Sequence, residues 1–134
     1  GRPGVSEANL KQYVSQCIEA METGAYLYFA HPDLVDYDDS TDLYKEEMRR
    51  LCKAAKRLEI PLEINLLGWW SGRHYPDPVF WEIAAEEGND AILGMDCHDP
   101  DRMYVESAVE EAKNMVRRLG INLLTDLENR FRKE

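Results

Sequence analysis

Long apolar runs, surplus positive charge and paired cysteine motifs are all lacking in this chain of 134 residues. No stretch approaches the roughly 20 apolar residues that a membrane-spanning helix needs, and no basic, apolar leader marks a secretory signal. The three cysteines, Cys17, Cys52 and Cys97, cannot all pair with one another. A reduced, cytoplasmic setting is therefore expected.

Positive charge is the clearest shortage, because 16 Lys and Arg residues face 26 Asp and Glu residues and leave a net charge of −10. Sequence-independent nucleic-acid binding depends on cations that neutralise phosphates, so this balance argues against nucleic acid as a partner. It argues equally against an anionic membrane surface. What is present is a globular composition, 44% hydrophobic and 31% charged, in a length that suits one domain.

Apolar runs alternate with amphipathic segments along the chain. Helices are predicted over 6–23, 42–58, 77–87 and 104–119, and strands over 25–30, 62–67, 90–95 and 121–124. Uninterrupted apolar strands that alternate with helices pair in parallel through right-handed crossovers. The predicted fold class is therefore α/β, either a small open sheet or part of a (β/α) barrel. The chain starts on a helix with no strand before it, which we expect of a piece of a longer domain.

Capping residues mark several of the predicted helix ends. Ser6 is expected to cap the first helix, and Asp77, which a proline follows, is expected to cap the third. Gly24, Gly88 and Gly120 stand where the first, third and fourth helices are expected to end. The second helix is expected to turn one apolar side inward, made of Leu43, Met48, Leu51, Cys52 and Ala55.

Histidine and aspartate follow the predicted strands, at the positions where parallel α/β folds carry their chemistry. His31 comes directly after the first strand, and Asp96 and His98 follow the third. Such residues on separate strand ends are how a rigid scaffold holds divalent metal ions. Each of them alone also fits an ordinary strand-end or helix-capping role. Together, two imidazoles and one carboxylate predict a metal site with an incomplete ligand shell.

Four further polar residues belong to the second predicted strand and its loop. Glu63 and Asn65 stand one alternation apart, so their side chains share a face, and a buried carboxylate there needs a partner. Arg73 has the donor geometry for bidentate phosphate binding, although a surface ion pair is its more ordinary role. His74 either contacts substrate or packs beside Tyr75.

Three segments carry a family pattern in a fixed order: FAHPD at 29–33, LEIN at 62–65 followed by GRHYP at 72–76, and LGMDCH at 93–98. Together they resemble the PHP family of metal-dependent phosphoesterases, most of all its histidinol-phosphatase branch. The resemblance extends over nearly all of the chain but matches only the C-terminal half of the family's domain. It implies that residues 1–134 form about four βα units of a distorted (β/α)7 barrel.

The resemblance implies metal ligands at the strand ends. His31 matches a ligand in the family's HPD segment, and Asp96 and His98 match the ligands of its last motif, one to each of two ions. Met95 and Cys97 replace the usual Ser and Ala of that motif. The family's N-terminal HxH motif, its bridging acidic residue and its middle histidine ligand have no counterpart here. In the complete domain the cofactors would be three divalent ions, Zn, Mn or Fe.

The resemblance also implies substrate contacts. Arg73 matches a residue that binds the substrate phosphate, and His74 is expected to assist it. Glu63 and Asn65 match the family's strand as supporting residues, with no direct metal role implied. The implied substrate is a small phosphate monoester such as histidinol phosphate.

The implied function is a hydrolase, a histidinol-phosphate phosphatase of histidine biosynthesis. The chain alone is expected to bind metal weakly and to be inactive, because several ligands are missing. One alternative is a non-catalytic half-barrel module that self-associates through exposed strand edges. Another is the PHP domain of a DNA polymerase. The RHYP loop and the short charged segment 130–134 favour the stand-alone phosphatase.

Overall fold

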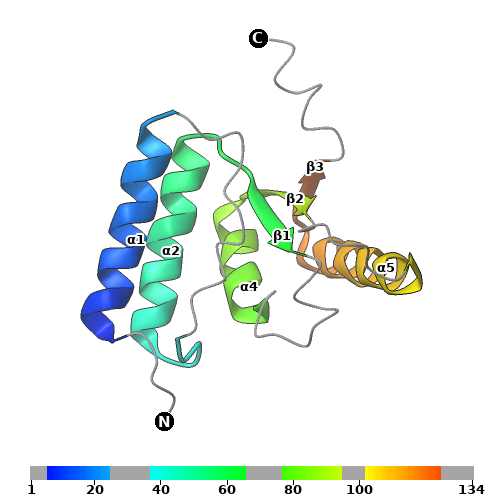
Figure 1. The fold of residues 1–134 in the computed structure, drawn as a ribbon, viewed down its shortest axis with the longest axis horizontal. Helices are drawn as coiled ribbons and strands as arrows, with labels where there is room; N and C mark the ends of the chain where they lie inside the picture. Colours follow the sequence, from blue (N-terminus) through cyan, green and yellow to red (C-terminus); the bar gives the residue numbers. More distant parts are fainter. Residues whose placement is uncertain (1–5, 25–36, 66–76, 95–101, 125–134) are drawn as a thin grey trace.

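The fold comes from a computed structural model that describes residues 6–24, 37–65, 77–94 and 102–124, with side chains from 106 onward in the last range. In chain order, these residues form α1 (Glu7–Glu22), α2 (Asp42–Arg57), β1 (Leu62–Asn65), α4 (Pro78–Glu87), β2 (Asp90–Gly94), α5 (Arg102–Leu119) and β3 (Asn122–Leu124). Helices and strands alternate from α2 onward, as predicted (Figure 1). The predicted strand over 25–30 lies outside the described residues.

Local capping sets the helix ends where the sequence predicts them. The Ser6 hydroxyl accepts a hydrogen bond, at 3.2 Å, from the backbone N–H three residues further on. The Asp77 carboxylate accepts one from the N–H of Val79 at 2.9 Å, and so caps α4. Gly88 follows the last turn of α4 with a φ of 76°, in the left-handed region where other residues are strained.

The three described strands form one parallel sheet in the order β1-β2-β3. Leu62 of β1 lies opposite Ala91 of β2, which lies opposite Leu123 of β3. Because right-handed crossovers join parallel neighbours, α4 and α5 cover the same face of this sheet. The α/β class and the parallel pairing are confirmed. Three strands do not close a barrel, so the barrel stays a proposal.

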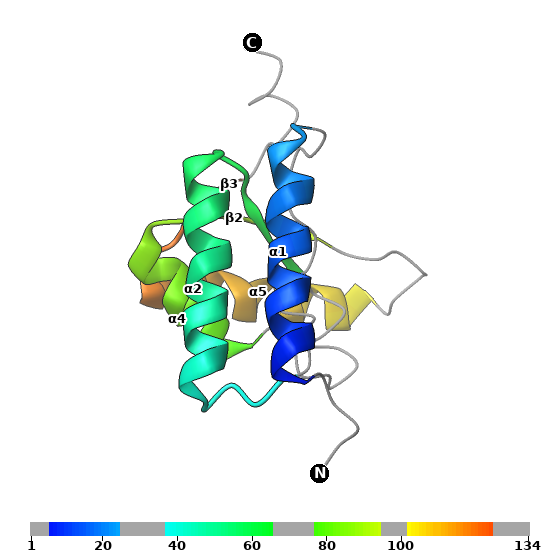
Figure 2. The same ribbon diagram turned by 90° about the vertical axis from the view of Figure 1, so that its left-hand side faces the viewer.

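The main core lies between this sheet face and the helices. Figure 2 shows α1 beside α2, and α4 packs against the other side of α2. The rings of Phe80 and Trp81 meet edge to face with centroids 5.1 Å apart. Among the described residues, no helix is long and apolar enough to cross a bilayer. The largest fully buried side chains are Trp81, Tyr44, Phe80, Leu10, Met21 and Met48.

The buried side of α2 differs in part from the prediction. Met48 and Leu51 are fully buried as expected, but Leu43 is only half-buried and Tyr44 takes its place in the core. Glu47 is buried as well, and its carboxylate pairs with Arg50, one turn further along the same helix, at 2.8 Å. The buried side of α2 therefore includes the aromatic Tyr44 and the charged Glu47 beside its apolar residues.

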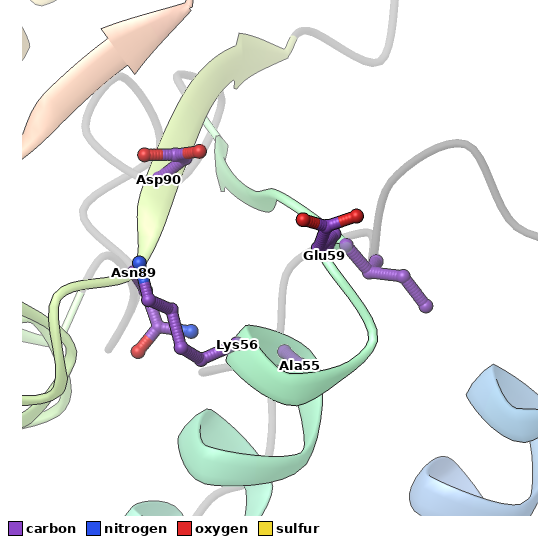
Figure 3. A pocket seen from close by; sticks show the side chains of 6 residues that line it. Ala55, Lys56, Glu59, Asn89 and Asp90 are labelled. Carbon is purple, nitrogen blue, oxygen red and sulfur yellow. The ribbon is translucent and has the colours of Figure 1, made fainter.

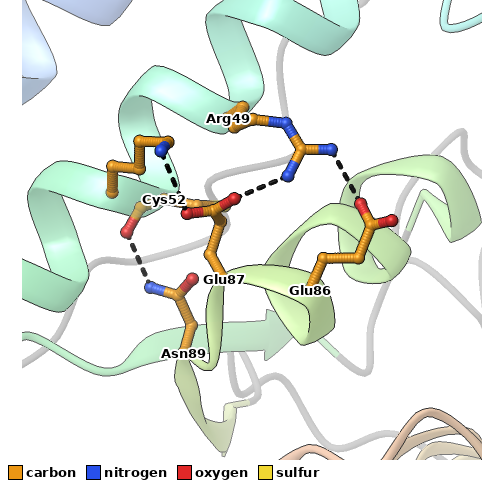
Figure 4. Close-up of polar contacts among 6 residues, drawn as sticks. Arg49, Cys52, Glu86, Glu87 and Asn89 are labelled. Atoms are coloured by element: carbon orange, nitrogen blue, oxygen red, sulfur yellow. Dashed lines mark hydrogen bonds and ion pairs between the residues drawn. The ribbon is translucent and has the colours of Figure 1, made fainter.

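Charged side chains join α2 to α4 at the surface. The guanidinium of Arg49 pairs with Glu87 at 2.6 Å and with Glu86 at 2.7 Å (Figure 4). Just below them, the buried Asn89 donates its side-chain N–H to the carbonyl oxygen of Cys52 at 2.9 Å. These contacts tie the end of α4 and the turn into β2 to the neighbouring helix α2.

Candidate functional site

The two faces of the sheet have different compositions. Leu62, Ile64 and Ala91 point into the core beneath the helices. On the other face, Glu63 pairs in register with Ile92, which is only 7% exposed yet lies outside the main core cluster. The alternation of a strand thus separates a purely apolar face from a face that carries polar groups.

Glu63 and Asn65 occupy this second face and are almost completely buried, with exposed fractions of 4% and 0%. The side-chain amide of Asn65 donates to Oε1 of Glu63 at 3.4 Å. The prediction that these two side chains share a face, and that the carboxylate has a partner, is confirmed. Their role in binding or catalysis stays a prediction.

Gly94, the last residue of β2, makes room for the Glu63 carboxylate. A β-carbon built at position 94 would lie 2.5 Å from Cγ of Glu63 and closer still to its carboxylate carbon and Oε2. Such an overlap does not occur between real side chains, so this position accepts glycine alone unless Glu63 moves. The sequence analysis missed this contact, and the glycine between two apolar strand residues was its one signal.

The carboxyl ends of β1 and β2 lie side by side, because Asn65 pairs with Gly94. In parallel α/β proteins, this is the edge where functional side chains collect. Asp96 and His98 come two and four positions after Gly94 in the sequence. The structure places neither of them, nor His31, since all three predicted ligands lie outside the described residues. The predicted phosphate-binding residues Arg73 and His74 lie outside them too.

A second buried carboxylate caps the N-terminal end of α4. Asp77 is 6% exposed, and the Tyr44 hydroxyl donates to its Oδ2 at 2.9 Å. Burial raises the pKa of Asp77, and the nearby carboxylate of Asp39 acts in the same direction. The hydrogen bonds from Tyr44 and from the Val79 N–H oppose this rise in pKa. Sequence analysis identified the cap but missed its burial, which depends on a tyrosine 33 positions away.

A shallow pocket opens at the other end of the sheet, near the start of β2 (Figure 3). Lys56 lines it and donates to the carbonyl oxygen of Gly88 at 2.9 Å. Asn89, also in the lining, is buried, and its Oδ1 has no hydrogen-bond partner among the described residues. The pocket's two carboxylates, Glu59 and Asp90, come from opposite sides of it (Figure 3). Its contacts tie the α4–β2 turn to α2.

In the part of the chain that the structure describes, no group of three or more His, Cys, Asp or Glu side chains lies close enough together to hold a metal ion. This leaves the predicted ligands untested, because they fall outside those ranges. Comparison with known proteins gives no match to any protein-family model, curated protein or solved structure.

Proposed function

We propose that this chain contributes the C-terminal half of a PHP-type barrel that hydrolyses a small phosphate monoester, with histidinol phosphate as the leading substrate. The observation that supports the proposal is the parallel pairing of β1 with β2, in which the described parts of two of the three family segments, 62–65 and 93–94, lie side by side. The order of these segments in the sequence supplies the rest of the support.

The proposed ligands suit the proposed ions. Two imidazoles, from His31 and His98, and the carboxylate of Asp96 form a donor set that Zn, Mn and Fe ions accept. Glu63 lies near the carboxyl edge of the sheet, where the side-chain amide of Asn65 donates to its carboxylate. Bound divalent ions would supply Lewis acidity and a local positive field in a chain whose net charge is −10.

Arg73 and His74 would act on the substrate. A guanidinium holds phosphate oxygens through two parallel hydrogen bonds, and it stabilises the charge that spreads over the phosphoryl group during transfer. His74, as the adjacent residue, would add a second hydrogen-bond donor to the phosphate. In this division, His31, Asp96 and His98 bind the metal ions, and Arg73 and His74 orient the substrate.

Metal titration of the 134-residue chain tests the ligand assignment. Isothermal titration with Mn²⁺ or Zn²⁺ is expected to give weak binding that His98→Ala and Asp96→Asn abolish. Glu86→Gln, which removes an exposed carboxylate on α4, serves as the matched control and is expected to bind like the parent chain. Equal binding by the parent chain and His98→Ala would contradict the proposal.

Phosphatase activity tests the function itself. Turnover of p-nitrophenyl phosphate or histidinol phosphate is expected only when a polypeptide with the family's HxH motif is supplied, on the same chain or in trans. Arg73→Ala is expected to raise KM for both substrates, because it removes a phosphate contact. Strong turnover by the 134 residues alone would overturn the expected ligand set.

A non-catalytic assembly module is the second candidate. Among the described strands, β1 and β3 each have a single neighbour, and unpaired strand edges promote association with another chain. Light scattering separates the two candidates. A stable oligomer that forms without metal supports the module, and a monomer that binds Mn²⁺ excludes it.

A further inference from the structure

The turn that precedes α2 brings a second carboxyl group to the buried Asp77. The carboxyl group of Asp39 lies within hydrogen-bonding reach of the Asp77 carboxyl group at the start of α4. Asp39 is half-buried, whereas Asp77 is 6% exposed. This contact therefore joins two segments that are far apart in the sequence, the turn before α2 and the N-terminal end of α4.

Hydrogen bonds anchor both sides of this contact. The Asp77 carboxyl group accepts from the Tyr44 hydroxyl and from the Val79 N–H, each at 2.9 Å. In the turn, the backbone N–H and the hydroxyl of Thr41 both donate to the carbonyl oxygen of Asp38, at 3.2 Å and 2.8 Å. The Thr41 hydroxyl oxygen also accepts from the backbone N–H of Tyr44 at 3.2 Å. Tyr44 thus contacts the turn through its backbone and Asp77 through its side chain.

Two carboxyl groups can form a hydrogen bond only when one of them holds a proton, because an ionised carboxylate is an acceptor alone. Without that proton the two charges repel each other, so the pair holds it more tightly than a lone carboxyl group does. Burial raises the pKa of Asp77, and Asp39 raises it further through its charge and its hydrogen bond. Among the described residues, Tyr44 and Asp39 are the titratable groups that act on this carboxyl group, and neither brings a positive charge.

We propose that Asp39 and Asp77 share one proton, and that this proton makes their contact a pH-sensitive clasp between the turn before α2 and the start of α4. Loss of the proton leaves two negative charges in contact. Asp77 stays in place, because its hydrogen bonds from Tyr44 and from Val79 strengthen when it is charged. The half-buried Asp39 turns toward water, and the clasp opens. This inference is independent of the proposed function.

Carboxyl ¹³C NMR titration tests the shared proton. In the parent chain, the resonances of Asp39 and Asp77 are expected to follow the same two titration steps. Asp39→Asn is expected to lower the midpoint of Asp77 by about one pH unit or more, because it removes a neighbouring charge and adds an amide donor.

Asp38→Asn is the matched control for this titration. Asp38 is exposed in the same turn, and its carboxylate accepts from the N–H and the hydroxyl of Ser40 at 3.0 Å and 2.6 Å. Asparagine keeps an acceptor oxygen there, so the midpoint of Asp77 is expected to stay unchanged. A single titration step of Asp77, with the same midpoint in the parent chain and in Asp39→Asn, would overturn the proposal.

Amide hydrogen exchange tests the opening of the clasp. The protection of the Thr41 N–H, corrected for the intrinsic effect of pH on exchange, is expected to be several-fold lower above the upper titration step than below it. In Asp39→Asn this protection is expected to be the same at both pH values. Equal protection on both sides of the step in the parent chain would overturn the clasp.

Urea unfolding at neutral pH tests whether the two residues act as a pair. Asp39→Asn is expected to raise the urea midpoint of the parent chain, because it removes the repulsion. In the background of Asp77→Asn it is expected to have no effect, since the repulsion is already gone. An equal gain from Asp39→Asn in both backgrounds would show that its charge acts elsewhere, and the pairing would be wrong.

Discussion

The two faces of the three-stranded sheet differ in the side chains that they bury. Leu62 and Ile64 are fully buried under the helices, and burial of such a side chain contributes about 1.5–3 kcal/mol. The residues that alternate with them, Glu63 and Asn65, bury polar groups on the other face, where a hydrogen bond joins the two side chains. The comparison indicates that the helix-covered face supplies most of the apolar burial of the sheet, while the other face combines apolar side chains with a buried polar pair.

The largest expected effect comes from the helix-covered face. Ile64→Ala is expected to lower the free energy of unfolding by about 2–5 kcal/mol, because it leaves a cavity in the core. Urea denaturation measures this loss. The comparison residue is Leu124, which is half-buried on the other face, and Leu124→Ala is expected to cost clearly less. Equal losses in the two variants would remove the distinction between the faces.

The second effect concerns Tyr44 and Asp77, a buried polar pair that lies among the helices and not on the second face of the sheet. Tyr44→Phe removes the hydrogen bond that the buried Asp77 carboxylate accepts, and is expected to cost about 1.5–3 kcal/mol. The loss is expected to be larger at neutral pH than in acid, because this hydrogen bond stabilises the charged form of Asp77. Urea unfolding at both pH values measures it, and a pH-independent loss would show that Asp77 is not ionised at neutral pH.

The third effect is the pH dependence of Asp77 itself. Burial raises the pKa of Asp77 in the folded state above its usual 3.8, so the folded state binds a proton more tightly than the unfolded chain does. The carboxylate is therefore destabilising above its folded pKa, and this penalty disappears as the pH falls below 3.8.

Asp77→Asn removes this penalty and keeps an equivalent N-cap, because asparagine accepts the Val79 N–H as aspartate does. The variant is therefore expected to gain stability relative to the parent chain as the pH rises from acid to neutral. Paired urea titrations measure the trend. A relative loss of stability at neutral pH would mean that the hydrogen bonds to the carboxylate outweigh its burial.

Local signals predicted the helix ends well, and contacts between distant residues set the limits of sequence analysis. Ser6 and Gly88 act through atoms within four residues or so of themselves, so their roles can be predicted from the sequence alone. The exchange of Leu43 for Tyr44 in the core depends on Asp77, which the amphipathic pattern of α2 does not contain. In the same way, the requirement for glycine at position 94 comes from a side chain on another strand.

The same difference between local signals and distant contacts applies to the candidate site. Its supporting pair, Glu63 and Asn65, was predicted from strand alternation and is confirmed as a buried, hydrogen-bonded pair on one face. Its proposed ligands follow from the order of segments in the sequence, and that order contains no distances. Bringing His31 together with Asp96 and His98 depends on how the segments after two predicted strands, 25–30 and 90–95, lie in space, which no local pattern specifies.

The smallest expected effect lies outside both faces, at the ion pairs between α2 and α4. The side chains of Arg49 and Glu86 are 38% and 61% exposed, so water screens their attraction. Arg49→Ala is expected to cost at most about 1 kcal/mol, and added salt is expected to shrink the difference from the parent chain. Urea denaturation at low and high salt measures both. A larger, salt-independent loss would mean that the stem of Arg49 packs as part of the core, and the helix layer would then owe its stability to more than its apolar residues.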